Sequence, residues 1–325
     1  MKTIVCTKYG APEVLQMKET KKPTPKSNEV LIKVNAVTVT LYDCWGRSGT
    51  APPGFLLLNR LVSGIRKPKH PILGTELSGE IEAVGNEVKR FKVGDQVFAF
   101  NGMNTGCYVE FICFPENGMV TQKPSNITFE EAAAIPYGGL TALHFLRAAN
   151  IQKGQKVLIF GASGGVGSFA VQIAKYFGAE VTGVCSTKKL EFVKSLGADK
   201  VFDYTKEDFS KSGVQYDVIF DTIGKSPFSG SKKSLKKEGY YIFATFGLLR
   251  VFRLLWLKLT SNKKVRLGVV EEKIDEFNFL KVLVETGKLR VIIDKQFPFD
   301  QIVEAHRYAE SRQAQGKIVV TVEHD

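Results

Sequence analysis

The chain has 325 residues, of which 44% are hydrophobic and 24% are charged, and its formal net charge is +12. This length is sufficient for two domains, and no apolar run approaches the roughly 18 residues that a membrane-spanning helix needs. The positive charge fits an anionic cofactor or substrate, an acidic membrane or nucleic-acid partner, or an ordinary solvated surface. Because no nucleic-acid-binding motif accompanies the basic residues, we expect no nucleic-acid partner.

The cysteines and the first residues indicate the compartment. Five cysteines are scattered without a CxxC pair, which suits buried thiols in a reducing environment. The opening residues, MKTIVCTKY, become charged too early to provide the apolar region of a signal peptide. We therefore expect a cytoplasmic protein. The cysteines are Cys6, Cys44, Cys107, Cys113 and Cys185.

Residues 1–125 have the pattern of an irregular antiparallel β domain. Short alternating strands are predicted there, for example at 30–34 and 96–100, and Gly, Pro and Asn interrupt them. From residue 126 to 260 the pattern changes, because apolar runs alternate with segments of helical period. Such alternation predicts a doubly wound parallel sheet. Its predicted strands are 155–160, 180–185, 200–204, 217–221 and 239–245, and its predicted helices include 168–177 and 188–196.

Residues 261–325 mix both kinds of element. We expect helices at 274–286 and 299–311 and strands at 290–294 and 317–322.

A glycine-rich turn lies between the first strand and the first helix of the parallel region. Residues without a Cβ allow so tight a turn and let its backbone approach a diphosphate, which the following helix N-terminus would bind. A dinucleotide site is favoured because the turn sits in a strand–turn–helix–strand unit. The predicted diphosphate contacts are Gly161, Ala162, Ser163, Gly164, Gly165, Val166 and Gly167.

The end of the second strand indicates which dinucleotide binds. An NAD site places a carboxylate there for the ribose 2′-hydroxyl, whereas this chain reads Cys185-Ser186-Thr187-Lys188-Lys189. A hydroxyl and two ammonium groups favour a 2′-phosphate, so NADPH is the expected cofactor. The alternative is that Lys188 and Lys189 only begin a helix, a position that the helix dipole disfavours for lysine.

Several segments together resemble the medium-chain dehydrogenase/reductase superfamily, in its quinone oxidoreductase (zeta-crystallin-like) branch. They are Leu73–Gly79, Val84–Gly85, Val93–Val97, Ala132–Pro136, Gly139–Ala142, Leu196–Asp199 and the glycine turn. The resemblance covers nearly the whole chain. It implies a GroES-like β-barrel domain over 1–125, a Rossmann domain over 126–260 and a segment 261–325 that completes the first domain. Homodimers are common in this family.

The resemblance also implies site residues. In this branch a lysine, a tyrosine and a C-terminal arginine bind the 2′-phosphate, and matching motifs place them at Lys189, Tyr204 and Arg312. Ser186 is a further expected contact, and Phe246 and Gly247 are expected beside the nicotinamide. Zinc-dependent members need Cys and His ligands where this chain has Thr40 and Thr75, so we expect no zinc.

Without zinc, hydride transfer to a quinone or an α,β-unsaturated carbonyl remains feasible, because such a substrate provides its own electron sink. The protein then orients the cofactor and donates hydrogen bonds to the developing oxyanion. Candidate residues around the reacting atoms are Thr40, Tyr42, Trp45, Tyr137 and Thr141. Two of them depart from the branch, which usually has asparagine at the position of Thr40 and tyrosine at that of Trp45. A phenol proton donor is thus lost at Trp45, and Tyr42 or solvent would have to replace it.

Two apolar and basic segments, residues 55–69 and 248–259, flank the expected site. Residues 248–259 have three interpretations: a lid over an apolar substrate, a dimer or core packing element, or an amphipathic helix on a membrane surface. The two segments together favour a small lipophilic carbonyl or quinone substrate, which a membrane could supply. Two other functions stay open, namely an enoyl-thioester reductase and a membrane-associated NADPH-binding protein with little catalysis.

Overall fold

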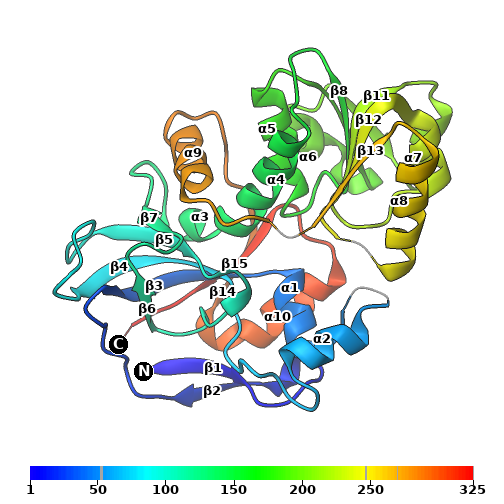
Figure 1. The fold of residues 1–325 in the computed structure, drawn as a ribbon. Coiled ribbons are helices and arrows are strands. Elements are labelled where there is room, and N and C mark those ends of the chain that lie inside the picture. Colours follow the sequence, from blue (N-terminus) through cyan, green and yellow to red (C-terminus); the bar gives the residue numbers. More distant parts are fainter. Residues whose placement is uncertain (52–53, 246, 269, 325) are drawn as a thin grey trace.

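The computed structural model describes residues 1–51, 54–245, 247–268 and 270–324, and these form two domains that pack along one junction (Figure 1). Both termini lie in the same domain, because the last strand, β15 (Lys317–Thr321), pairs with β3 (Glu29–Val39). The chain is an α/β protein with one irregular, mostly antiparallel domain and one parallel-sheet domain, which confirms the predicted fold class. Within the described residues, no helix is both long and apolar enough to span a membrane.

The first domain is a curved sheet with a small second sheet beside it. Its strand order is β14-β15-β3-β4-β5-β7, with β6 on β3, while β1 and β2 form the small sheet. All pairs are antiparallel except β14 with β15. Helices α1 (Leu41–Ser48) and α10 (Ile302–Ser311) lie against each other below the sheet (Figure 1). The strands are β1 (Lys2–Cys6), β2 (Leu15–Glu19), β3 (Glu29–Val39), β4 (Glu76–Val84), β5 (Gln96–Phe100), β6 (Phe111–Pro115), β7 (Val120–Gln122), β14 (Ile293–Pro298) and β15 (Lys317–Thr321).

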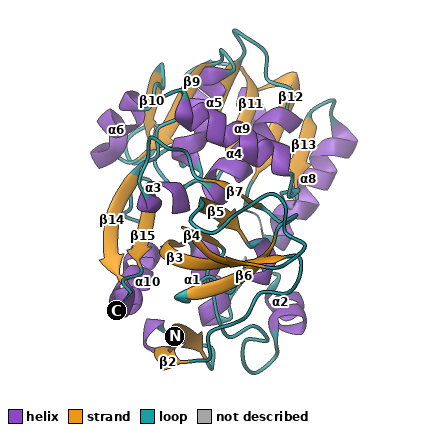
Figure 2. Ribbon diagram, turned by 90° about the vertical axis from the view of Figure 1, so that its left-hand side faces the viewer, coloured by secondary structure: helices purple, strands orange, loops and turns teal. Residues whose placement is uncertain are grey.

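The second domain is a six-stranded parallel sheet in the order β10-β9-β8-β11-β12-β13. Helices α4 (Pro136–Ala148), α5 (Gly167–Tyr176), α6 (Leu190–Ser195) and α9 (Ile274–Glu285) share the larger core on one face. Helices α7 (Phe228–Ser234) and α8 (Leu248–Thr260) cover the other face (Figure 1), while α4, α5 and α9 lie in front of the strands in Figure 2. The strands are β8 (Lys156–Phe160), β9 (Glu180–Cys185), β10 (Lys200–Asp203), β11 (Tyr216–Asp221), β12 (Leu235–Phe243) and β13 (Lys264–Leu267).

Strand order reverses beside β8, since β9 lies on one side of it and β11 on the other. Ligands of doubly wound sheets bind at such a switch point, beyond the carboxyl ends of the strands. The predicted glycine turn follows the carboxyl end of β8, and Ser186 follows that of β9. The fold therefore brings residues distant in sequence to one edge of the sheet.

The boundary expected at residue 260 differs from the observed one. Strand β13 pairs with β12, and Phe277 and Leu280 of α9 pack in the same core as α4 and α5. The parallel-sheet domain thus extends through α9, and only the segment from β14 onward completes the first domain. Helical period identified α9 correctly but gives no information on which domain a helix packs against.

Local differences are small and have local causes. The strand expected at 290–294 is β14, which begins only at Ile293, because the Leu289 amide donates to the Leu283 carbonyl of α9 and the Arg290 amide donates to the side-chain oxygen of Gln172. The helix expected at 188–196 is split into a 3₁₀ turn, Thr187–Lys189, and α6. Short helices α2 (Leu56–Ser63) and α3 (Phe129–Ala133) complete the structure, and Thr128 and Glu131 form a capping box on α3.

Candidate active site

The glycine turn connects β8 to α5 in a conformation that requires glycine. Gly161 has φ +82°, and a Cβ there would lie 2.7 Å from Thr222 Oγ1. A Cβ on Gly167 would lie 2.1 Å from the carbonyl oxygen of Gly161. No side chain caps the N-terminus of α5, so its free N–H groups are available to an anion. The geometry fits a dinucleotide diphosphate.

Two further segments enclose this turn, and the sequence did not reveal either. The amide of Gly316 donates to the carbonyl of Ser163 at 3.0 Å, and a Cβ on Gly165 would lie 3.1 Å from Lys317 Cδ. On the other side, a Cβ on Gly138 of α4 would lie 2.4 Å from the Gly165 carbonyl oxygen. Small residues at these positions thus let α4 and the C-terminal segment approach the turn closely.

The expected 2′-phosphate residues meet at the end of β9. Lys189 Nζ donates to the carbonyls of Ala314, at 2.8 Å, and Arg312, at 3.5 Å. Tyr204 lies at the same end, since its amide donates to the Cys185 carbonyl at 3.1 Å and its side chain is 56% exposed. Burial lowers the pKa of Lys189, while the charge of Asp294 raises it. The structure therefore brings Lys189 and the Arg312 segment into contact and leaves Tyr204 open to a ligand.

One carboxylate near this position was missed. Asp203 ends β10, directly beside Cys185, and is almost fully buried. It accepts hydrogen bonds from the hydroxyl of Thr187 and from the amide and hydroxyl of Thr205, the last two at 3.0 and 2.6 Å. The end of the second strand itself carries no carboxylate, but the fold places the carboxylate of Asp203 beside it. Because these bonds occupy Asp203 and Thr187, the groups left for a phosphate include Ser186 and Lys189.

The five expected catalytic residues divide into two groups. Thr40 caps α1: its hydroxyl donates to Asp43 Oδ2 at 2.6 Å and accepts from the Asp43 amide. Thr141 donates to the Tyr137 carbonyl at 2.6 Å, one turn earlier in α4. Both threonine hydroxyls thus have local structural partners. Trp45, on α1, is half-buried.

Tyr42 and Tyr137 form the second group. Burial raises the pKa of Tyr42, and the neighbouring Asp43 raises it further. Burial also raises the pKa of Tyr137, as do the charges of Asp43, Glu76 and Tyr42. Among the described residues, neither phenol hydroxyl has a hydrogen-bond partner. Both phenols thus stay protonated at neutral pH and are free to donate to a substrate oxygen.

A buried ion pair between Glu76 and Lys317 lies beside this group, and sequence reasoning did not single it out. Glu76 is 0% exposed and Lys317 is 4% exposed. The carboxylate also accepts from the Thr38 hydroxyl and, at 2.6 Å, from the Tyr137 amide. Lys317 Nζ lies 5.6 Å from the centre of the Tyr137 ring. The pair therefore joins the first domain to α4. The sequence did contain one indication of this pair, because Lys317 begins an otherwise apolar strand. A charge buried with such a strand needs a partner of opposite sign.

Comparison with known proteins identifies the family. A model of the alcohol dehydrogenase GroES-like domain matches residues 26–125, and one of a zinc-binding dehydrogenase matches residues 196–320. The chain is 34% identical over 315 residues to the chloroplast envelope quinone oxidoreductase homolog of Arabidopsis thaliana, covering 92% of this chain and 91% of that protein. It belongs to the quinone oxidoreductases of the medium-chain dehydrogenase/reductase superfamily.

Other members of this superfamily are similarly related. The chain is 33% identical over 336 residues to a chloroplastic NADPH-dependent alkenal/one oxidoreductase of Arabidopsis thaliana, covering 98% of this chain and 79% of that protein. The structure of the Escherichia coli quinone oxidoreductase complexed with NADPH matches with a TM-score of 0.84 at 28% identity, covering 99% of this chain and 100% of that one. CurK enoyl reductase matches with a TM-score of 0.87 at 27% identity, covering 99% of each chain. The predicted family is therefore confirmed.

The positions that correspond to zinc ligands do not fit the metal. The Thr40 hydroxyl donates to Asp43, and Thr75 is buried with no hydrogen-bond partner for its hydroxyl among the described residues. Zinc prefers thiolate, imidazole and carboxylate donors. In the described part of the chain, no three His, Cys, Asp or Glu residues gather as a metal site would require. The family description names zinc, whereas this donor set does not fit a zinc ion.

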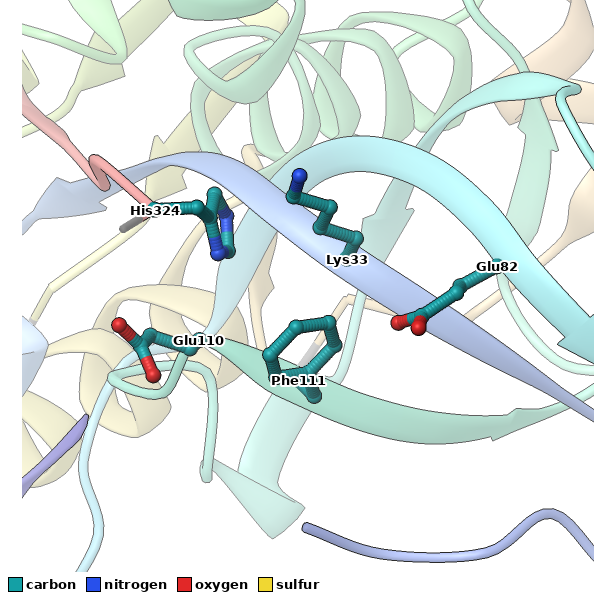
Figure 3. A pocket seen from close by; sticks show the side chains of 5 residues that line it. All are labelled: Lys33, Glu82, Glu110, Phe111 and His324. Carbon is teal, nitrogen blue, oxygen red and sulfur yellow. The ribbon is translucent and has the colours of Figure 1, made fainter. Parts of the chain in front are cut away.

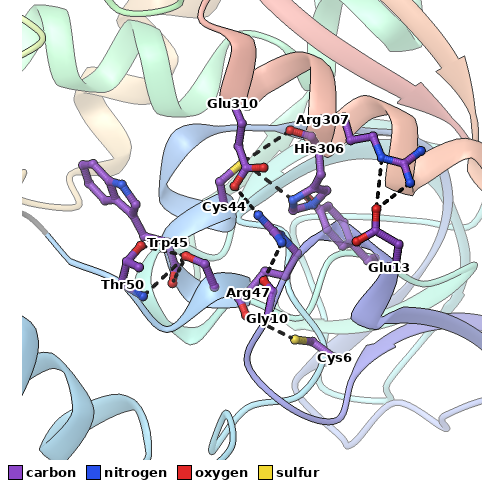
Figure 4. Close-up of polar contacts among 12 residues, drawn as sticks. Cys6, Gly10, Glu13, Cys44, Trp45, Arg47, Thr50, His306, Arg307 and Glu310 are labelled. Atoms are coloured by element: carbon purple, nitrogen blue, oxygen red, sulfur yellow. Dashed lines mark hydrogen bonds and ion pairs between the residues drawn. The ribbon is translucent and has the colours of Figure 1, made fainter.

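One histidine and cysteine do meet, although their spacing gave no sign of it. Cys44 Sγ lies 3.6 Å from His306 Nδ1 (Figure 4), and His306 Nε2 lies 3.3 Å from the Tyr108 hydroxyl. Nearby, buried Arg47 pairs with Glu310 and donates to the Gly10 carbonyl at 2.6 Å. These contacts fix α1 on α10, so their role is to hold the element that carries Tyr42. Burial, with the charge of Arg47, lowers the pKa of His306 to about 3.

Acidification is expected to destabilise the protein through His306. An unfolded histidine has a pKa near 6.5, so the unfolded chain takes up a proton below that pH, while folded His306 stays neutral until about pH 3. The contribution of His306 to stability is thus present above pH 6.5 and falls by about 2 kcal/mol between pH 7 and 5. Urea unfolding of the protein and of His306→Gln at pH 7 and pH 5 would measure this contribution. The free energy of unfolding should fall less between the two pH values in His306→Gln than in the unmodified protein.

Comparing the pH dependence of stability in the two proteins cancels the contributions of other titrating groups, which both proteins share. Burial raises the pKa of Asp43 to about 6, so protonation of Asp43 stabilises the folded chain as the pH falls from about 6 toward 4, which is the opposite sign. His70→Gln, at an exposed position, serves as the control, and its free energy of unfolding should depend on pH as that of the unmodified protein does. An equal change in the free energy of unfolding between pH 7 and pH 5 in the protein and in His306→Gln would contradict the prediction.

A surface pocket of about 210 Å³ lies in the first domain, away from the residues described above (Figure 3). Lys33, Glu82, Glu110, Phe111 and His324 line it. His324 Nε2 donates to the Val34 carbonyl at 2.7 Å, and Glu110 accepts from the Lys2 amide at 2.6 Å. These bonds tie the C-terminal end of the chain to β3 and the N-terminal end to Glu110, the residue before β6. The pocket is explained by this packing of the termini.

Proposed function

We propose that this protein is a zinc-independent oxidoreductase that uses NADPH to reduce a quinone or an α,β-unsaturated carbonyl compound. The observation that carries the proposal is the glycine turn at the uncapped N-terminus of α5, with Lys189 and the Arg312 segment in contact nearby. The names of the relatives, quinone oxidoreductase and alkenal/one oxidoreductase, support the substrate class. The NADPH-bound structural relative supports the cofactor.

The residues have distinct tasks in this proposal. When bound, NADPH supplies the hydride. The backbone from Gly161 to Gly167 and the N-terminus of α5 bind the diphosphate, and Ser186, Lys189, Tyr204 and Arg312 bind the 2′-phosphate. Gly247, at the start of α8, follows the carboxyl end of β12 and borders the nicotinamide site. Phe246, the other expected nicotinamide neighbour, lies outside the described residues.

Tyr42 and Tyr137 are the proposed donors to the substrate oxygen. A reduced enone or quinone develops negative charge on that oxygen, and a nearby neutral phenol stabilises it by hydrogen bonding and can supply the proton. Thr40 and Thr141 orient α1 and α4 rather than donate, because their hydroxyls are already engaged. The indole N–H of Trp45 can donate a hydrogen bond but is too weak an acid to deliver a proton, so Trp45 would form part of the wall of the substrate site.

Removing both phenols tests this assignment. The Tyr42→Phe/Tyr137→Phe variant is expected to lower kcat by on the order of 100-fold, since one preorganised donor to an oxyanion contributes about that much. Steady-state rates with a soluble enone would measure the loss, and a separate titration should show unchanged NADPH affinity. Thr141→Val is the control for packing in α4. An unchanged kcat in the double variant would assign protonation to solvent and contradict the proposal.

A substrate panel tests the function as a whole. Quinones, enones, aldehydes and crotonyl thioesters would be compared by the loss of nicotinamide absorbance, with NADPH and NADH in parallel, and zinc would be measured by elemental analysis. Faster turnover of thioesters than of free enones would favour an enoyl-thioester reductase, to which the likeness to CurK enoyl reductase also points. Tight NADPH binding without turnover would favour a cofactor-binding protein with little catalysis, and stoichiometric zinc would contradict the proposal.

The remaining expectations are proposals as well. Analytical ultracentrifugation would test the homodimer, and fractionation of cells would test the cytoplasmic location. Nucleic acid is still not an expected partner. Peripheral contact with a membrane has a structural basis in the residues around α2 and α8.

A further inference from the structure

Two segments that are distant in sequence expose large apolar side chains beside the proposed site. On and after α2, Leu57, Leu61 and Ile65 are 75%, 62% and 68% exposed. At the start of α8, Leu249 and Phe252 are 66% and 61% exposed, whereas Leu254 is buried in the core of the parallel-sheet domain. The segment 248–259 is thus a packing element on one face and open on another.

The two segments touch each other. A Cβ on Gly54, just before α2, would lie 2.4 Å from the Cβ of Leu248, the first residue of α8. Figure 1 shows α2 and α8 on the same side of the molecule, one on each domain. We call the exposed side chains of Leu57, Leu61, Ile65, Leu249 and Phe252 the apolar face. Large exposed apolar side chains on segments that touch each other mark an interaction site more often than an ordinary surface does.

Charge around the apolar face has a single sign. The chain has 33 acidic residues, yet none lies between residues 44 and 75 or between residues 239 and 270, the two stretches that contain α2 and α8. Exposed basic residues in these stretches include Arg66, Lys67, Lys69 and Arg253. Among the described residues, none of these four has an acidic partner within ion-pair distance. Arg60 differs, because it stacks on Tyr9 at 3.9 Å and anchors α2.

We infer that this surface docks on anionic lipid bilayers, with the apolar face inserted at the interface and the four basic side chains near the lipid headgroups. Exposed leucines flanked by cations without any acid are the composition of membrane-surface helices. A second copy of the chain fits less well, because self-association through this surface would oppose two clusters of like charge. Nucleic acid offers the charge but no apolar environment for the leucines.

The docking proposal needs no catalysis, but its consequence for substrate delivery rests on the proposed function. Gly247, which borders the proposed nicotinamide site, directly precedes α8. A bilayer bound at the apolar face would therefore hold lipophilic quinones or enones close to the reacting atoms. Substrate dissolved in the membrane would reach the site without crossing water.

Sedimentation with vesicles tests the docking. The full chain is expected to bind vesicles of phosphatidylcholine mixed with phosphatidylglycerol, to bind pure phosphatidylcholine much less, and to dissociate at high salt. Arg66→Glu/Lys67→Glu/Lys69→Glu should weaken binding to the anionic vesicles by on the order of 100-fold or more, at about 1 kcal/mol per charge near the surface. Leu57→Asp/Leu249→Asp should weaken it as well while keeping the net positive charge high.

A matched control separates this surface from the overall charge. Lys21→Glu/Lys89→Glu/Lys92→Glu changes the net charge equally at exposed positions away from α2 and α8, and it should bind nearly as well as the unmodified chain. Equal losses in both triple variants, no binding of the unmodified chain, or dissociation of a dimer by the leucine variant would overturn the proposal.

In all variants the rate with a water-soluble enone should be unchanged, which shows that they are folded and that the proposed reaction is intact. A selective loss with a bilayer-dissolved quinone would support delivery from the membrane, whereas equal rates would refute that consequence.

Discussion

Lys189→Glu is expected to weaken NADPH binding by about 2 kcal/mol or more, which is roughly 30-fold in Kd. The ammonium group now donates to the carbonyls of Ala314 and Arg312, at the place where the 2′-phosphate is proposed to bind. The substitution removes an attraction and adds a repulsion against a group with nearly two negative charges. NADH has no 2′-phosphate, so its affinity should change much less. Fluorescence titration with both cofactors measures the two effects.

The control for this prediction is Lys194→Glu, on α6, which begins directly after Lys189. Lys194 pairs with Glu191 on an exposed face of that helix, so the variant has the same charge change away from the proposed pocket. It should bind both cofactors normally. Equal losses of NADPH and NADH affinity in Lys189→Glu would mean that the turn or the helix has been disturbed, and the assignment of the phosphate pocket would fail.

Breaking the Glu76–Lys317 pair is expected to have the largest effect on stability. Both side chains are almost fully buried, and removing one partner leaves the other charge unpaired in the protein interior. Lys317→Met or Glu76→Gln should each lower the free energy of unfolding by about 3–5 kcal/mol. Thermal unfolding with NADPH absent would show this as a clear fall in Tm. The combined variant, Glu76→Gln/Lys317→Met, should recover most of the loss because no charge then stays buried alone.

An exposed ion pair provides the comparison. Lys175 and Asp199 are 34% and 38% exposed, and Lys175→Met should cost no more than about 1 kcal/mol, as solvent screens such pairs. If Lys317→Met were as mild as Lys175→Met, the network of Glu76, Thr38 and Tyr137 would not hold the two domains together. If the double variant were as unstable as the sum of the single ones, charge would not be the cause.

Sequence patterns predicted the elements whose signals are local. The strands at 96–100 and 180–185 match β5 and β9, since alternation or a continuous apolar run between turn residues depends only on neighbours in the chain. The glycine turn was predictable for the same reason, because a positive φ at Gly161 and the close approach at Gly167 both demand the absence of a Cβ. The lysines after the second strand likewise favoured NADPH as the cofactor. They could be identified from sequence because they follow the strand directly in the chain.

The sequence by itself therefore determined the two-domain α/β class, the family and the dinucleotide turn. The tertiary structure alone decided that β13 and α9 belong to the parallel-sheet domain, that Thr40 serves α1 as a cap, and that Asp203 lies beside Cys185. It also decided that Lys317 meets Glu76 across 241 residues and that Cys44 meets His306 across 262. The physical reason is that periodicity and turn chemistry act over a few residues, whereas burial of a charge or a polar side chain depends on which distant segment the fold places against it.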